Sequence, residues 1–266
     1  MSRRWFQALI AAALAAAVTF LALPVAGLLV DVPPGDLLAR LDDPASVDAL
    51  LLSLRTTAIA LFVILAVGTP AAWLLATRAF PGRTLVTTLL ELPLVLPPAV
   101  AGIALLAAFG PEGLVGPWLR ELGIDVALTT TGVVAAQVFV ASPFYVRQAQ
   151  AAFAGLDPSL LEASRTLGAS EARTLARVAI PVALPALTTG AILAWGRALG
   201  EFGVTLIVAG SFQGVTETAP LAIFGSFGSD FPAALALSVV LLAVSAALLA
   251  AAKRLSGPGL VGDARP

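Results

Sequence analysis

The chain has 266 residues, of which 59% are hydrophobic and only 12% are charged, and its formal net charge is −1. This composition excludes an ordinary soluble domain and predicts an integral membrane protein that lies in the lipid bilayer, with no nucleic-acid partner. The sequence contains neither Cys nor His. Disulfides, thiolate chemistry and the commonest metal ligand and general base are therefore excluded, and we expect neither a metal site nor a catalytic centre.

Six apolar runs, each long enough to cross a bilayer as a helix, lie at about residues 6–30, 47–77, 84–109, 129–152, 178–210 and 231–252. They predict an all-α polytopic membrane protein with six transmembrane helices in a single domain, residues 1–266. The first run follows Arg3 and Arg4 and could be a secretory signal. Its apolar stretch is about twice as long as that of a signal, which favours a retained helix.

The distribution of charge supports this topology. Six crossings place most basic residues on one side, namely Arg3, Arg4, Arg78, Arg83, Arg147, Arg165, Arg173, Arg177, Lys253 and Arg254. The opposite loops hold most of the acidic residues, with Arg40, Arg55 and Arg120 as the main basic exceptions. Because cytoplasmic loops are enriched in Lys and Arg, we predict that both termini are cytoplasmic.

A charged loop, residues 155–177, interrupts the apolar sequence. Asp157 and Pro158 are typical of the start of a helix, Gly168 of its end, and Ser170 of the start of a second short helix. The first helix is expected to carry an apolar stripe formed by Leu160, Ala163 and Leu167. This pattern alone also fits an amphipathic segment that lies among anionic lipid headgroups.

The particular residues of the charged loop narrow its interpretation. Glu162, Ala163 and Ser164, followed by Gly168 and then by Val178, Ile180 and Pro181, resemble the EAA-loop motif of bacterial and archaeal ABC-importer permeases. Ser164, Val178 and Ile180 are conservative departures from that motif. The resemblance implies a coupling helix that binds an ATPase subunit through Glu162, Ala163, Ser164, Arg165, Leu167, Gly168 and Ala169.

ATP hydrolysis is expected to come from another chain. The sequence has no G-x-x-x-x-G-K-[ST] motif, and its only lysine is Lys253, so it cannot form a P-loop. We expect a permease subunit that is not an enzyme and binds no cofactor, with ATP and Mg²⁺ held by the ATPase.

The resemblance, which covers about residues 47–255, implies a type I ABC importer with two ATPase subunits, an external or periplasmic solute-binding protein and a second permease. That second permease is expected to be another copy of this chain, although the sequence also allows a different one.

Two further stretches indicate the transported ion. The segments "LLELPLVLPPAVAGIALLAAFG", residues 89–110, and "RALGEFGVTLIVAG", residues 197–210, resemble molybdate-type permeases, and sulfate permeases share much of the second. Pro93, Pro97 and Pro98 are expected to bend or interrupt the third span. The resemblance implies import of a tetrahedral oxyanion, molybdate or tungstate first, with sulfate or thiosulfate as the alternative.

Candidate residues for the translocation path lie in the predicted fifth span. Arg197 and Glu201 have i,i+4 spacing and are expected on one helix face, either as a structural ion pair or with Arg197 lending positive potential to an anion path. Thr188, Thr189 and Thr205 are further candidates, as are Gln137 and Ser142, although such groups often bond to their own helix.

Two other classes of membrane protein compete with this assignment. An ion-coupled secondary transporter would need an ion site and often shows inverted repeats, and the sequence reveals neither. A non-transporting membrane scaffold would leave the gapped loop motif unexplained.

Overall fold

The computed structural model describes residues 3–30 and 43–256, which form helices and their connections, with no strand in these two ranges. In chain order the helices are α1 (Arg3–Val30), α3 (Pro44–Thr77), α4 (Arg83–Glu91), the 3₁₀ turn η1 (Leu92–Leu94), α5 (Pro98–Phe109), α6 (Gly116–Glu121), α7 (Thr130–Ala154), α8 (Pro158–Thr166), α9 (Glu171–Thr174), the π-helical turn η2 (Leu175–Ala179), α10 (Ile180–Leu199), α11 (Gly203–Ala209), α12 (Ala219–Ser226) and α13 (Phe231–Ser256). The expected all-α fold class is therefore confirmed for the described chain.

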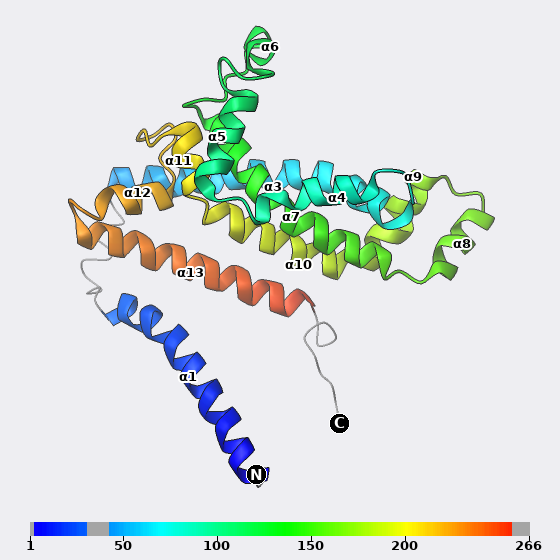
Figure 1. Cartoon of the computed structure of the whole chain (residues 1–266), viewed down its shortest axis with the longest axis horizontal. Coiled ribbons are helices and arrows are strands. Elements are labelled where there is room, and N and C mark those ends of the chain that lie inside the picture. The colour runs from blue at the N-terminus through cyan, green and yellow to red at the C-terminus, as the bar shows by residue number, and fades with distance from the viewer. Residues whose placement is uncertain (1–2, 31–42, 257–266) are drawn as a thin grey trace.

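The core of the bundle is built around α7. Helices α3 and α10 pack along it, α13 packs against α10, and α1 lies apart beside α13 (Figure 1). Ala60, Ala141, Ala149 and Ala194 are fully buried, and such small side chains let helix backbones approach closely. The charged loop, with α8 and α9, lies at one end of this bundle, and α11 and α12 lie at the other (Figure 1).

A second cluster of buried apolar residues joins α5 and α11 to α7. The α5–α11 contact depends on two glycines, because a Cβ atom at Gly102 would lie 2.7 Å from Ile207 and one at Gly203 would lie 2.7 Å from Pro98. Real Cβ atoms do not approach other atoms so closely, so neither position has room for a side chain. The short α11 is thus fixed against α5.

The third predicted span, 84–109, is not one continuous helix. The segment Arg83–Leu94 and the helix Pro98–Phe109 meet at a bend of 120°. Proline lacks a backbone N–H and disfavours helical backbone in the residue before it, and Pro97 has the extended ψ of 139°. The expected interruption is confirmed, whereas a straight crossing is not found.

The fifth predicted span, 178–210, is divided differently from the prediction. Its helix extends back through η2 and α9 to Glu171 and ends at Leu199, and α11 follows separately. Gly200 and the two non-helical residues Glu201 and Phe202 make the break. The prediction of one helix to residue 210 is wrong, because the apolar sequence continues past a glycine that ends the helix.

The described residues do not confirm six crossings. Four helices are long and apolar enough to cross a membrane, Trp5–Val30, Pro44–Thr77, Glu171–Leu199 and Phe231–Leu255, and the bent pair could supply a fifth. The predicted span 129–152 forms α7 but is not among them. Gln137, Ser142 and Arg147 make α7 more polar, and a helix enclosed by other helices has little surface that lipid must cover.

Candidate functional site

The charged loop begins with a well-defined cap. The backbone N–H of Ser159 donates to the Asp157 carboxylate at 2.9 Å, and Pro158 occupies the first helical position of α8. This backbone hydrogen bond lowers the pKa of Asp157. The predicted helix start at Asp157 and Pro158 is confirmed.

The end of α8 has a Schellman arrangement. The N–H of Ala169 donates to the Ser164 carbonyl at 3.1 Å, and the N–H of Gly168 donates to the Arg165 carbonyl at 2.9 Å. Gly168 has a φ of +77°, a conformation that costs a residue with a Cβ atom considerably more than it costs glycine. Gly168 therefore ends α8 as predicted and turns the chain toward α9, which Ser170 caps.

The inner face of α8 is held by a hydroxyl pair. Ser164 Oγ lies 2.9 Å from Thr174 Oγ1 in a buried hydrogen bond between α8 and α9, and Leu161 packs against the main apolar cluster. The predicted apolar stripe of Leu160, Ala163 and Leu167 lies on the exposed surface of the loop, and Leu167 is 87% exposed. The described chain therefore leaves this stripe uncovered.

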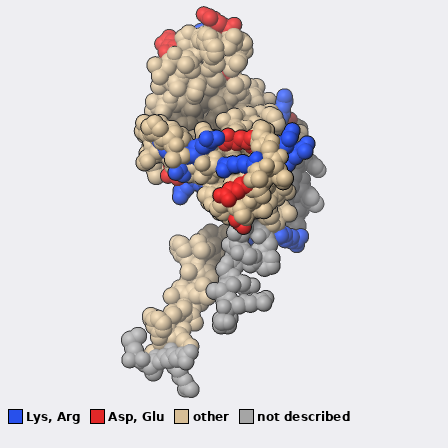
Figure 2. Space-filling view, turned by 90° about the vertical axis from the view of Figure 1, so that its right-hand side faces the viewer, with Lys and Arg blue, Asp and Glu red and all other residues tan. Residues whose placement is uncertain are grey.

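Glu162 and Arg165 are exposed beside the stripe. Basic and acidic side chains gather at this end of the molecule (Figure 2). The structure thus brings the sequence-predicted loop residues together on α8 and the turn that follows it, with an outer surface that is apolar along the stripe and charged around it. A rigid surface of this kind is suited to binding a protein partner.

One ion pair at this end was missed by the sequence reasoning. Arg78, the residue that follows α3, contacts Glu171 at the start of α9, with 2.7 Å between Nη2 and Oε2. This hydrogen bond raises the pKa of Arg78. Thr77, Arg78, Arg165 and Glu171 together line a cavity of about 350 Å³. The paired residues are 93 positions apart, so no local pattern indicates their contact.

The buried ion pair at the other end of α10 differs from its prediction. Arg197 Nη2 and Glu201 Oε2 lie 2.8 Å apart, and the side chain of Glu201 is 2% exposed, against 33% for Arg197. Glu201 is not on the same helix, because α10 ends at Leu199. Its Oε1 atom instead accepts the N–H of Val204 at 2.8 Å, in the first turn of α11. One carboxylate therefore joins α10 to α11.

The threonine candidates for the translocation path either form hydrogen bonds within their own helix or are fully buried. Thr188 and Thr189 donate to carbonyl oxygens one turn earlier, those of Leu184 and Pro185. Thr205 is fully buried, and its hydroxyl has no hydrogen-bond partner among the described residues. Of the candidates in this part of the chain, the partly exposed Arg197 is the one that carries a positive charge.

Two other polar candidates also have partners inside the bundle. Gln137 donates through Nε2 to Thr56 Oγ1 at 3.1 Å, and Ser142 lies 3.5 Å from the Phe139 carbonyl. Trp195 donates to Thr57 Oγ1 at 3.0 Å. The bonds of Gln137 and Trp195 hold α7 and α10 against α3, whereas the contact of Ser142 stays within α7. A structural role is therefore favoured for Gln137 and Trp195.

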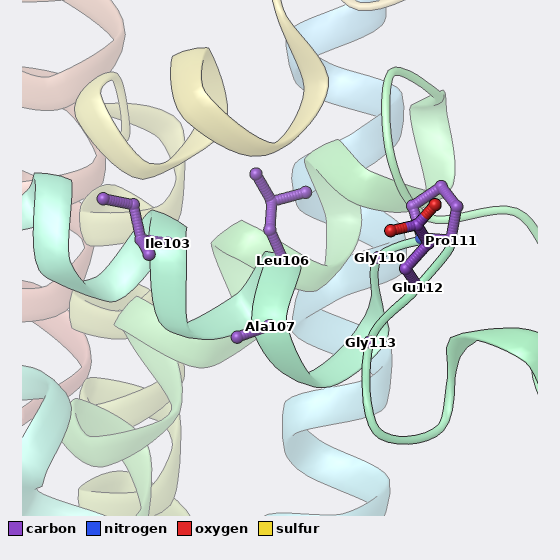
Figure 3. Close-up of a pocket in the computed structure, with 7 residues that line it drawn as sticks. All are labelled: Ile103, Leu106, Ala107, Gly110, Pro111, Glu112 and Gly113. Atoms are coloured by element: carbon purple, nitrogen blue, oxygen red, sulfur yellow. The ribbon is translucent and has the colours of Figure 1, made fainter.

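A cavity of about 540 Å³ lies where α5 runs into the following turn (Figure 3). Ile103, Leu106 and Ala107 form one wall, and residues 110–113 form the other (Figure 3). Among the described residues that line it, Glu112 alone is charged, and its carboxylate would repel an anion. This cavity therefore offers no site for an oxyanion.

The Ser164–Thr174 hydroxyl pair in the charged loop contributes measurably to the free energy of unfolding. We expect Thr174→Val to lower the free energy of unfolding by about 1–3 kcal/mol, because it leaves the buried Ser164 hydroxyl without its partner. The double variant Ser164→Ala/Thr174→Val removes both hydroxyls and should be close to the wild type. Thermal unfolding in detergent compares the three chains. An equal loss in the single and the double variant would contradict the pairing.

Comparison with known families decides the assignment. The family model described as "Binding-protein-dependent transport system inner membrane component" matches residues 68–257. The chain belongs to this family of ABC-importer permeases. It is a multi-pass protein of the inner membrane.

Individual relatives agree with this assignment. The molybdenum transport system permease protein ModB of Mycobacterium tuberculosis is 43% identical over 234 residues, which cover 87% of this chain and 88% of that protein. The sulfate transport system permease protein CysT of Escherichia coli is 41% identical over 179 residues, 67% of this chain and 65% of that protein.

A solved structure shares the fold. It is a bacterial alginate ABC transporter in complex with an alginate pentasaccharide-bound periplasmic protein, with a TM-score of 0.75 and 17% identity. The match covers 96% of this chain and 95% of that chain. The fold is therefore that of an ABC-transporter membrane subunit.

Proposed function

We propose that this ABC-importer permease passes a tetrahedral oxyanion across the inner membrane, molybdate or tungstate first, with sulfate or thiosulfate as the alternative. The observation that carries the proposal is the 43% identity to a molybdenum permease over 87% of this chain. The match to a sulfate permease has similar identity over 67% of the chain, and it supports sulfate as the alternative substrate.

The proposed transporter has two copies of this chain, each with six crossings and cytoplasmic termini, together with two ATPase subunits that hold ATP and Mg²⁺ and hydrolyse the ATP. A periplasmic or external solute-binding protein delivers the ion. The solved alginate transporter with its periplasmic protein supports this choice of partner. The exposed stripe of Leu160, Ala163 and Leu167 supports docking of the ATPase on α8.

The transport cycle follows from two discrete packings of the helices. Closure of the ATPase subunits displaces the two charged loops, and the membrane helices change from an inward-facing to an outward-facing packing. Arg197 attracts the anion electrostatically. Glu201, 2.8 Å from Arg197, keeps the local charge near neutral, so that the ion is not trapped in the path.

Substrate identity is tested by ATPase activity in proteoliposomes that contain this chain and its ATPase subunit. The binding protein is added empty or loaded with molybdate, tungstate or sulfate. We expect the molybdate-loaded or tungstate-loaded form to stimulate ATP hydrolysis most. Stimulation by the sulfate-loaded form alone would select the alternative, and equal activity with empty and loaded forms would contradict an importer driven by a loaded binding protein.

A further inference from the structure

The charged loop follows α7 directly, and from α9, near its other end, two routes lead to the membrane helices. The covalent route runs from α9 through the π-helical turn η2 into α10. The second route is the ion pair between Glu171, the first residue of α9, and Arg78, the C-cap of α3. These routes reach different helices, so a displacement of the loop need not act through α10 alone.

The covalent route is locally irregular. In η2 the N–H of Ile180 donates to the carbonyl of Leu175, five residues earlier, instead of to the fourth residue back. Pro181 follows and supplies no N–H to the ladder. Turns of this kind occur as isolated defects in helices, often at functional sites, and they can bend a helix. The junction with α10 is therefore able to absorb part of a displacement.

The ion-pair route begins on a more rigid unit. The buried Ser164–Thr174 hydrogen bond fixes α8 against α9, and the Schellman arrangement at Gly168 fixes the turn between them. A force on the exposed face of α8 thus moves α9 and its first residue, Glu171, together with α8. Arg78 lies directly across from Glu171, at the end of a helix of 34 residues.

We propose that the Arg78–Glu171 ion pair is a second transmission link, which passes the displacement of the charged loop to α3. This inference rests on the proposed function, and it makes Arg78 and Glu171 positioning residues for the transport cycle. Helix α3 packs along α7 and accepts hydrogen bonds from Gln137 on α7 and Trp195 on α10. A displacement of the end of α3 is thereby transmitted to α7 and α10 at the centre of the bundle.

Because both side chains of the pair are exposed, a role in transmitting the displacement can be distinguished from a role in folding stability. The side chains of Arg78 and Glu171 are 58% and 48% exposed, and ion pairs of this kind contribute little to folding stability. Loss of the pair should therefore change the amount of ion transported for each ATP hydrolysed and leave thermal stability unchanged. A structural role would instead lower the thermal stability and leave the amount of ion transported for each ATP unchanged.

The chain offers a matched control. Arg147 Nε lies 3.2 Å from Glu91 Oε1, in an ion pair with exposures of 61% and 39% that joins α7 to the end of α4. This pair has the same chemistry and similar exposure but does not involve the charged loop. Arg147→Ala therefore measures the effect of losing an ion pair without losing the proposed link.

The test measures the ratio of ion taken up to ATP hydrolysed in proteoliposomes with the ATPase subunit and binding protein, using molybdate and sulfate in parallel. For Arg78→Ala and for Glu171→Ala we expect the ratio to fall about two- to thirtyfold, the size of effect seen for residues that modulate coupling between sites. The double variant Arg78→Glu/Glu171→Arg should restore most of the wild-type ratio. Arg147→Ala should match the wild type, and all variants should unfold at the wild-type temperature.

An unchanged ratio in the single variants, no recovery in the reversed pair, or an equal loss in Arg147→Ala would overturn the link. These outcomes presuppose a wild-type complex that takes up an oxyanion at the expense of ATP. A wild-type complex that transports neither molybdate nor sulfate would contradict the proposed function instead, so the two failures are distinguishable.

Discussion

Gly168→Val is expected to reduce ATP-dependent uptake about tenfold or more and to weaken co-purification of the ATPase subunit, while the membrane helices remain folded. A side chain in the left-handed region costs about 1–2 kcal/mol, and a β-branched one is the least tolerated there. No atom lies within 4 Å of a Cβ at this position, so the effect comes from the backbone and not from a clash. The turn that presents α8 to its partner should therefore deform locally.

Gly82 provides the control for this substitution. It also has a positive φ, +84°, and no atom within 4 Å of an added Cβ, but it precedes α4 and lies outside the charged loop. Gly82→Val should show a comparable strain with the ATPase still bound. Circular dichroism checks the helix content of both variants, and co-purification with uptake checks docking. Normal docking in Gly168→Val would show that the loop surface does not depend on this turn.

Glu201→Ala is expected to lower the free energy of unfolding by about 1.5–3 kcal/mol, the range for hydrogen bonds to charged groups, and to reduce uptake strongly. The substitution leaves the Val204 N–H and the Arg197 guanidinium without the carboxylate that joins them. Both ends of the break between α10 and α11 lose their common partner.

Glu201→Gln is the matched variant, because an amide oxygen can still accept the Val204 N–H while the negative charge is lost. We expect it to keep more stability than Glu201→Ala and to bind the anion too tightly for fast release. Thermal unfolding in detergent and initial uptake rates separate the two effects. If both variants unfold and transport like the wild type, Glu201 neither joins the helices nor balances the charge of Arg197.

Local features of the fold could be predicted from the sequence because each depends on a few neighbouring residues. The cap at Asp157, the turn at Gly168 and the interruption near Pro97 all follow from the backbone preferences of those residue types. The direction taken after the interruption, a bend of 120°, depends on how α5 packs against α11, which no local pattern contains.

The predictions that were wrong or missing at the candidate sites also involve packing that no local pattern contains. Arg197 and Glu201 have helical spacing, so the sequence predicts one helix face, whereas Gly200 ends α10 and leaves Glu201 to accept the N–H of Val204 in α11. Arg78 and Glu171 meet only because α3 ends and α9 begins at the same side of the bundle. The family motif identified the loop residues, but their exposed and buried faces required the structure.

The proposed function requires this chain to import an oxyanion at the expense of ATP hydrolysed by another subunit. The most direct measurement is uptake of radiolabelled molybdate into proteoliposomes that contain this chain and its ATPase, with the binding protein outside and ATP inside. We predict uptake with ATP and none with a non-hydrolysable analogue. Uptake that needs no ATP and follows an imposed ion gradient would rule out an ABC importer and indicate a secondary transporter.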